Sequence, residues 1–121
     1  MIKLGKMEYD NLIAGDTPTK AVEIVIKNPC NFKRGSVIGK TEDDDFKLVD
    51  HTAEDGSESP IGIITDDIIV EIGETKTTTM YISGEFARSR TIFGGDDTYE
   101  NHENNMDKIG LILRTTIRGV R

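Results

Sequence analysis

Short apolar runs separated by turn-forming residues constrain the fold of this chain more than any other feature. Apolar and polar residues alternate over residues 19–27, where Val22, Ile24 and Ile26 share one face, as in a half-buried strand. Gly, Asp, Asn and Ser, which favour tight turns, are common between the runs that follow. Further short strands are predicted at residues 36–40, 46–49, 61–65, 68–72 and 77–83. The sequence therefore predicts a mainly β domain.

The connections around these strands are predicted from their turn residues. Residues 28–31 form a turn that ends the first strand, because Asn and Pro there interrupt the alternation. Residues 83–86 are predicted to form a bend or a bulge at a glycine and to lead into another short strand over residues 86–93.

The C-terminal third is predicted to contain a loop, a helix and a last strand. Residues 94–105 are too acidic for a core and are expected to form a surface loop. Met106, Ile109 and Leu113 recur at helical spacing, which predicts one helix near residues 104–114, with its N-terminus capped by Asn104. A last strand is expected over residues 116–120.

Composition predicts one domain with a thin core. The chain has 121 residues, of which 36% are hydrophobic, 6% aromatic and 31% charged, and it contains no Trp. A single domain of this size buries only about two thirds of its unfolded surface. We therefore expect contacts with other chains to supply part of its stability.

Charge and cysteine content exclude several classes of function. Residues 1–40 carry seven Lys and Arg against four Asp and Glu, whereas residues 41–121 carry eight against eighteen, and the net charge is −7. This acidic body argues against a nucleic-acid partner. Cys30 is the only cysteine, so neither an internal disulfide nor a cysteine-rich metal site is expected. No apolar run is long enough for a membrane span or a secretion signal, so we expect synthesis in a cytoplasm.

The stretch RGSVIGKT, residues 34–41, is close to a phosphate-binding loop but lacks one residue between its glycines. Val37 and Ile38 are β-branched and favour extended backbone rather than a tight curl around phosphate. Four acidic residues at 42–45 follow immediately and would repel a nucleotide. The stretch is therefore interpreted as a short strand between two glycine turns.

Other candidate chemistry is weak. The acidic residues 42–45 lack the glycine and the distal Glu of a calcium loop and are interpreted as a solvated turn. His51 and His102 are the only histidines, and zinc would need further ligands at a definable spacing. Ser57 and Ser59 lack the flanking glycines of a nucleophile elbow. We expect no enzyme activity, no cofactor and no metal.

Four motifs in order carry a family resemblance. They are LIAGD at residues 12–16, KRGSVIGK at 33–40, DGSESPIGIITDDI at 55–68 and ISGEF at 82–86. Together they make the chain similar to the lambda-type head decoration proteins of tailed bacteriophages, over roughly residues 12–120. The resemblance implies a small β-clip-like domain with one short C-terminal helix. It further implies a homotrimer that binds the major capsid protein at three-fold and quasi-three-fold positions on the outer surface of the virion, and stabilises the head.

Residues 1–18 mix charge, Gly and Pro without a sustained period, so they are expected to form an extended N-terminal arm before a β-rich decoration domain, residues 19–121. The arm and the first strand are expected to bind the capsid by adding a strand to a capsid subunit, with Lys3, Lys6 and Lys20 facing an acidic surface. The expected contact residues are Leu12, Ile13, Ala14, Gly15, Asp16, Pro18, Val22, Ile24 and Ile26. The alternative is a carbohydrate-binding or adhesive β-module that uses residues 94–105.

Overall fold

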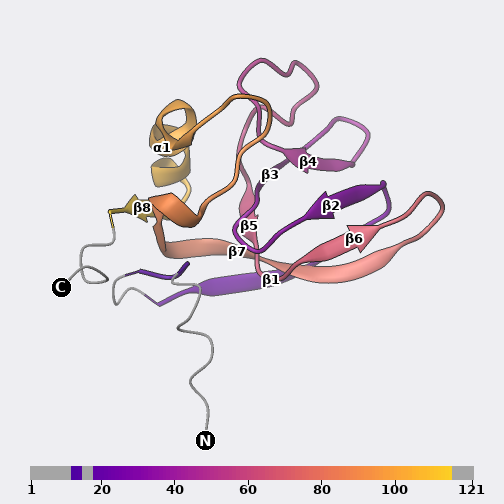
Figure 1. Cartoon of the computed structure of the whole chain (residues 1–121), viewed down its shortest axis with the longest axis horizontal. Coiled ribbons are helices and arrows are strands. Elements are labelled where there is room, and N and C mark those ends of the chain that lie inside the picture. The colour runs from indigo at the N-terminus through magenta and orange to yellow at the C-terminus, as the bar shows by residue number, and fades with distance from the viewer. Residues whose placement is uncertain (1–11, 15–17, 116–121) are drawn as a thin grey trace, which may run out of the picture.

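A computed structural model describes residues 12–14 and 18–115 of the chain (Figure 1). The described part is mainly β, with one short α-helix near its C-terminal end, which confirms the predicted fold class. The elements are β1 (Lys20–Ile26), β2 (Cys30–Phe32), β3 (Val37–Lys40), β4 (Phe46–Leu48), β5 (Gly62–Ile64), β6 (Ile68–Val70), β7 (Lys76–Ala87), α1 (Tyr99–Lys108) and β8 (Leu111–Arg114).

The long strand β7 organises the main sheet. The strand order is β1-β7-β5-β3-β4, all antiparallel, and β8 pairs in parallel with the last four residues of β7. Strands β2 and β6 form a separate two-stranded sheet. In Figure 1, α1 and β8 lie at one end of β7, and the turn between β6 and β7 projects at the other end.

Both faces of the main sheet are covered by apolar side chains. Neighbouring residues point to opposite faces of a strand, so Val37 and Ile63 join one cluster while Ile38 and Ile64 join another. The first cluster consists of Leu12, Val37, Val49, Ile63, Phe86, Met106, Leu111 and Leu113. The second consists of Ile26, Phe32, Ile38, Phe46, Ile64, Val70 and Met80.

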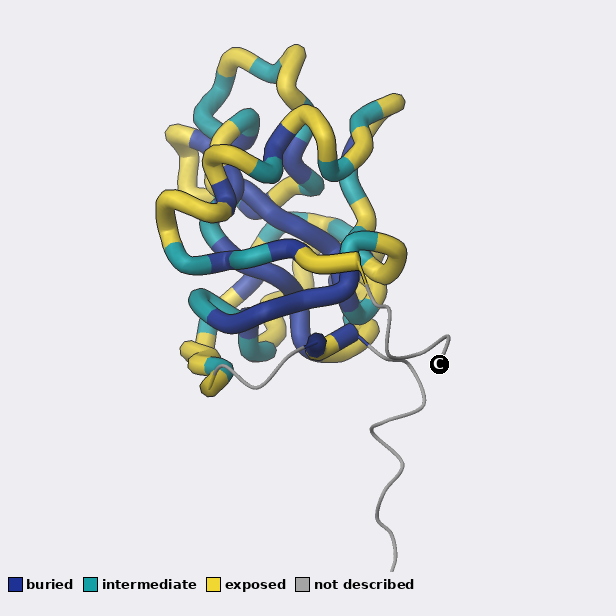
Figure 2. The backbone as a smooth tube through the Cα atoms, turned by 90° about the vertical axis from the view of Figure 1, so that its left-hand side faces the viewer, coloured by how far each residue is buried: buried dark blue, intermediate teal, exposed yellow. Residues whose placement is uncertain are grey.

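The strands that carry these clusters run through the middle of the molecule, and the exposed residues concentrate in the loops around them (Figure 2). The described residues form two apolar clusters of their own, and the expected contribution of contacts with other chains to stability stays a prediction. Low hydrophobic content is offset because β3 and β5 have almost no solvent-facing side and use each apolar residue for packing.

The structure corrects two predicted segments in the middle of the chain. Residues 30–32 form strand β2 instead of the end of a turn, because Cys30 and Phe32 pair with β6 and pack in the second cluster. Residues 86–93 are not a strand: β7 continues through Ala87, and a 3₁₀ helix follows at Arg88–Arg90. The bend or bulge predicted at residues 83–86 lies next to an irregularity of β7, where Ile82 is the extra residue opposite the Lys20/Ala21 step of β1.

The helix was predicted too far along the chain. It spans Tyr99–Lys108, so much of the expected surface loop 94–105 is helical, and residues 111–114 form β8. Thr98, not Asn104, caps the helix: its Oγ1 accepts from Glu100 N at 3.3 Å, and its N–H donates to Asn101 Oδ1 at 2.9 Å. The strand predicted at residues 116–120 lies outside the described residues.

Candidate functional site

Residues 12–14, assigned to the arm from the sequence, pack into the domain. Leu12, which precedes the first strand, is 1% exposed and belongs to the first cluster. Ala14 N donates to Glu85 O at 2.8 Å, and Leu12 O accepts from Ala87 N at 2.7 Å. Ile13 lies between them, forms a bridge with Phe86 and is 43% exposed. These three residues therefore extend the β1 side of β7.

The other predicted contact residues occupy different environments. Val22 is 39% exposed, Ile24 is half-buried, and Ile26 is fully buried in the second cluster. Along β1, the side chains predicted to bind a capsid subunit become progressively more buried in the domain's own core. Ile26, the last of them, is not available at the surface. Pro18 is exposed, whereas Gly15 and Asp16 lie outside the described residues. The capsid-binding role of this set stays a prediction.

The outer main-chain edge of β1 is a second candidate contact that the side-chain pattern did not reveal. Strand β1 is the terminal strand of the main sheet and, among the described residues, pairs only with β7. Thr79 directs its carbonyl oxygen toward β5, where it accepts from Thr65 N at 3.2 Å. In an antiparallel pair, its partner Glu23 therefore directs its N–H and C=O away from β7. The same alternation applies to Ala21 and Val25.

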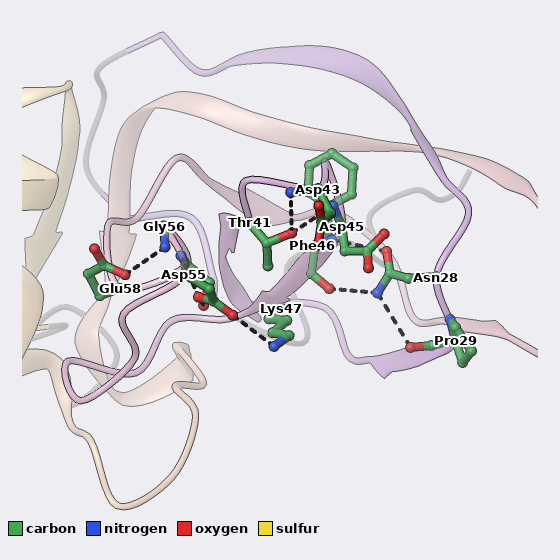
Figure 3. A network of polar contacts seen from close by, with 11 residues as sticks. Asn28, Pro29, Thr41, Asp43, Asp45, Phe46, Lys47, Asp55, Gly56 and Glu58 are labelled. Carbon is green, nitrogen blue, oxygen red and sulfur yellow. Dashed lines mark hydrogen bonds and ion pairs between the residues drawn. The ribbon is translucent and has the colours of Figure 1, made fainter.

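The acidic turn 42–45 is organised by neighbouring polar side chains, as Figure 3 shows. Thr41 Oγ1 accepts from Asp43 N at 3.2 Å and from Asp45 N at 3.0 Å. Asn28 holds the next residue on both main-chain groups, because its Oδ1 accepts from Phe46 N at 2.9 Å and its Nδ2 donates to Phe46 O at 2.8 Å. The turn is thus formed by hydroxyl and amide contacts, which is consistent with the solvated-turn interpretation.

The adjacent turn at residues 55–57 is built around Asp55. Its Oδ1 accepts from Ser57 Oγ at 2.6 Å, and its Oδ2 accepts from Lys47 Nζ at 2.9 Å. The Ser57 hydroxyl and the Lys47 ammonium hold the pKa of the Asp55 carboxyl well below its usual range. Ser57 therefore has a structural partner and is not arranged as a nucleophile.

The phosphate-loop-like stretch is a packed strand, as predicted. Val37 and Ile38 are fully buried in β3. Gly35 has φ +99°, and a Cβ there would lie 2.3 Å from Arg90 O. A Cβ on Gly39 would lie 2.5 Å from Ser57 O, so both glycines are required by close backbone approach. The Arg34 guanidinium donates to Thr65 O at 2.7 Å and to Tyr81 Oη at 3.0 Å.

A polar cluster that sequence reasoning missed surrounds Asp97. Its carboxylate is 3% exposed and contacts His51 Nδ1 and His102 Nε2, each at 2.5 Å. His51 N also donates to Asp97 Oδ2 at 2.6 Å. Burial raises the pKa of Asp97, but the hydrogen bonds from His102 and His51 outweigh it, and the net pKa lies below the usual range.

The surface loop expected over residues 94–105 includes His102, which acidic and amide residues flank in the sequence. In the structure it lies on the buried face of α1 with Met106, and its ring stacks on Phe93 at a centroid distance of 5.3 Å. Among the described residues, its Nδ1 atom is buried and has no hydrogen-bond partner. A helical pattern that counts only aliphatic residues cannot find such a position.

An ion pair joins α1 to the end of β7. Arg88 Nε donates to Glu103 Oε1 at 3.0 Å, and Arg88 Nη2 contacts Glu103 Oε2 at 2.5 Å. The Arg88 guanidinium holds the pKa of Glu103 below its usual range. It also lies 5.2 Å from the centroid of the Tyr99 ring. Tyr99 and Phe93 are both partly buried and pack against the first cluster.

Comparison with protein-family models decides the relationship of the chain. The model described as bacteriophage lambda head decoration protein D matches residues 1–109. The chain belongs to this family. The match confirms the resemblance seen in the four motifs, although it starts before and ends earlier than the expected range 12–120. No curated protein matches the sequence significantly.

Membership in the head decoration family implies association with a phage capsid and a place in the virion. The family consists of structural proteins of the head and is not a class of enzymes. Among the described residues, none of the helices has the length and apolar character needed to cross a membrane.

Proposed function

We propose that this protein decorates the outer surface of a phage head as a homotrimer that binds the major capsid protein at three-fold and quasi-three-fold positions. The family match carries this proposal, because it covers most of the chain. Bound in this way, the protein stabilises the head. The host cell synthesises it in the cytoplasm, where heads assemble.

The proposed contact is the outer edge of β1 together with the residues that precede it. Open strand edges are templates for pairing with another chain, and main-chain hydrogen bonds then supply affinity. The basic excess of residues 1–40 suits an acidic capsid surface, with Lys20 exposed on β1. Val22 and Val25 are 39% and 54% exposed and add apolar area on either face of the strand.

This arrangement revises the expected role of the arm. Strand β1 contributes its outer main-chain groups, while Ile26 stays in the core and Leu12 and Ala14 anchor the start of the domain. A truncation that tests the arm must therefore stop before Leu12. Deletion of residues 2–11 is expected to weaken capsid binding and leave the domain folded.

The test mixes purified protein with undecorated heads and counts bound copies per head. Glu23→Pro removes an outward N–H and leaves the hydrogen bonds to β7 in place, because proline is tolerated at such edge positions. Glu23→Ala is the matched control, since it removes the same charge but keeps the N–H. We expect Glu23→Pro to weaken binding at least about tenfold, the equivalent of about 1.4 kcal/mol, and Glu23→Ala to bind nearly as the unmodified protein does.

The outcomes separate the contact from the function. Binding of Glu23→Pro at the unmodified level would reject the β1 edge as the contact while leaving decoration intact. Absence of binding by the unmodified protein to heads of its own phage would reject decoration itself. Image reconstruction of decorated heads that shows single copies, and not clusters of three at the three-fold and quasi-three-fold positions, would reject the trimer.

A further inference from the structure

Two segments that lie far apart in the sequence bring three metal-ligating side chains together beside the start of α1. Asp50 and His51 follow β4, and Asp97 precedes the helix cap Thr98. One donor atom from each side chain lies within 4.8 Å of the other two. The set offers two carboxylate oxygens and one imidazole nitrogen.

Asp97 is held in a fixed orientation from behind. Its Oδ2 contacts His102 Nε2 at 2.5 Å, and the His102 side chain is 1% exposed and stacked on Phe93. Carboxylates that bind metals are commonly fixed by such outer hydrogen bonds. The Asp97 side chain is itself only 3% exposed, so its position does not depend on solvent.

Asp50 is also oriented toward the same point. Its Oδ1 accepts from Thr52 N at 2.9 Å and from Thr52 Oγ1 at 2.7 Å. A Cβ on Gly95 would lie 2.6 Å from Asp50 Oδ2. The absence of a side chain at this position therefore lets the Asp50 carboxylate lie close to the backbone of residue 95. The His51 side chain is 56% exposed, which gives an ion access from solvent. Residues 50–54 and 94–98 contain no Lys or Arg that would compete for the carboxylates.

We propose that Asp50, His51 and Asp97 form a binding site for a divalent cation that is intermediate between hard and soft. Zn²⁺ is the ion with which we test the site. Imidazole with carboxylate is a donor set that Zn²⁺ accepts, whereas Ca²⁺ and Mg²⁺ prefer oxygen ligands alone. The ion replaces the hydrogen bond between His51 Nδ1 and Asp97 Oδ1, and the exposed His51 ring turns outward to admit it. Water completes the coordination. The ion then ties the loop after β4 to the N-terminus of α1.

This site was not expected from the sequence, because the two histidines are 51 positions apart and only one of them is a ligand. The second histidine, His102, acts by positioning Asp97. The proposal does not depend on capsid binding and is tested with the isolated full-length protein.

The experiment measures Zn²⁺ binding to the metal-free protein by calorimetry and follows thermal unfolding with and without Zn²⁺. We expect one site per chain and a rise of the unfolding midpoint by about 3 °C or more at saturating Zn²⁺. Co²⁺ is expected to bind at the same site and to give a visible absorption band that Zn²⁺ abolishes. Ca²⁺ and Mg²⁺ at the same concentration are expected to shift the midpoint less.

Variants locate the site. Asp50→Asn and His51→Gln each remove one partly exposed donor, and each is expected to weaken Zn²⁺ binding at least about tenfold, in line with losses seen when metal sites are perturbed. Asp55→Asn in the neighbouring loop and Cys30→Ser are matched controls and are expected to bind normally. Unchanged binding in both Asp50→Asn and His51→Gln, or loss of binding in Cys30→Ser, would overturn the proposal. So would the absence of any midpoint shift with Zn²⁺ in the unmodified protein.

Discussion

Replacement of Leu12 by Ala tests whether the start of the described chain belongs to the domain or to a tail that matters only on the capsid. Leu→Ala removes three carbon groups, each worth about 0.8 kcal/mol when buried. Leu12 is 1% exposed beside Phe86 and Val37, so the transfer contribution is about 2.4 kcal/mol. The cavity left in a packed cluster raises the loss to about 3–4 kcal/mol.

Such a loss is a large fraction of the stability of a domain, which is typically about 5–15 kcal/mol. The assay is urea unfolding of the free protein, at one protein concentration and without heads. Ile13→Ala is the matched control, because the same three carbon groups are removed from a side chain that is 43% exposed. Its expected cost is about 1 kcal/mol. Equal and small losses for both variants would refute the packing of residues 12–14 against β7.

Two further predictions concern a close backbone contact and the loss of stability at acidic pH. Gly39→Ala is expected to lower the free energy of unfolding by about 1–3 kcal/mol, because the added Cβ would lie 2.5 and 2.7 Å from the main-chain oxygens of Ser57 and Ser59. An unchanged free energy of unfolding in urea would contradict this close approach. Arg88 lowers the pKa of Glu103, so this pair stabilises the folded protein above the ordinary carboxyl pKa, and the contribution is lost as the pH falls through the lowered pKa. Glu103→Gln should therefore show a shallower fall in urea midpoint between about pH 5 and pH 3 than the unmodified protein does, and an equally steep fall would contradict the role of the pair.

Local patterns predicted most of the strands because each strand is short and is bounded by turn residues. The predicted segments 19–27, 36–40, 46–49, 61–65 and 68–72 all contain the strands found there. Prediction failed where packing overrides the local pattern. Cys30–Phe32 became a strand only because β6 lies beside it, and β7 runs through Gly84 because β8 pairs with its last four residues.

The helix shows the same limit at the level of single residues. Its cap uses Thr98 with Asn101, where the common pattern has Glu or Gln at the third helical position. Its buried face is made by His102 and Met106, and a histidine in an acidic stretch gives no apolar signal. The prediction was therefore displaced toward Met106, Ile109 and Leu113, the last of which lies in β8.

The sequence alone determined the β-rich class, the strand character of RGSVIGKT and the family, because turn chemistry, β-branching and motif order are local properties of the chain. Only the tertiary structure decided that Leu12 and Ile26 are interior, that β1 pairs on one side only among the described residues, and that Asp50, His51 and Asp97 converge. These features depend on which strands pair and which loops meet. That choice is made by the packing of apolar side chains on both faces of one sheet, between residues distant in the sequence.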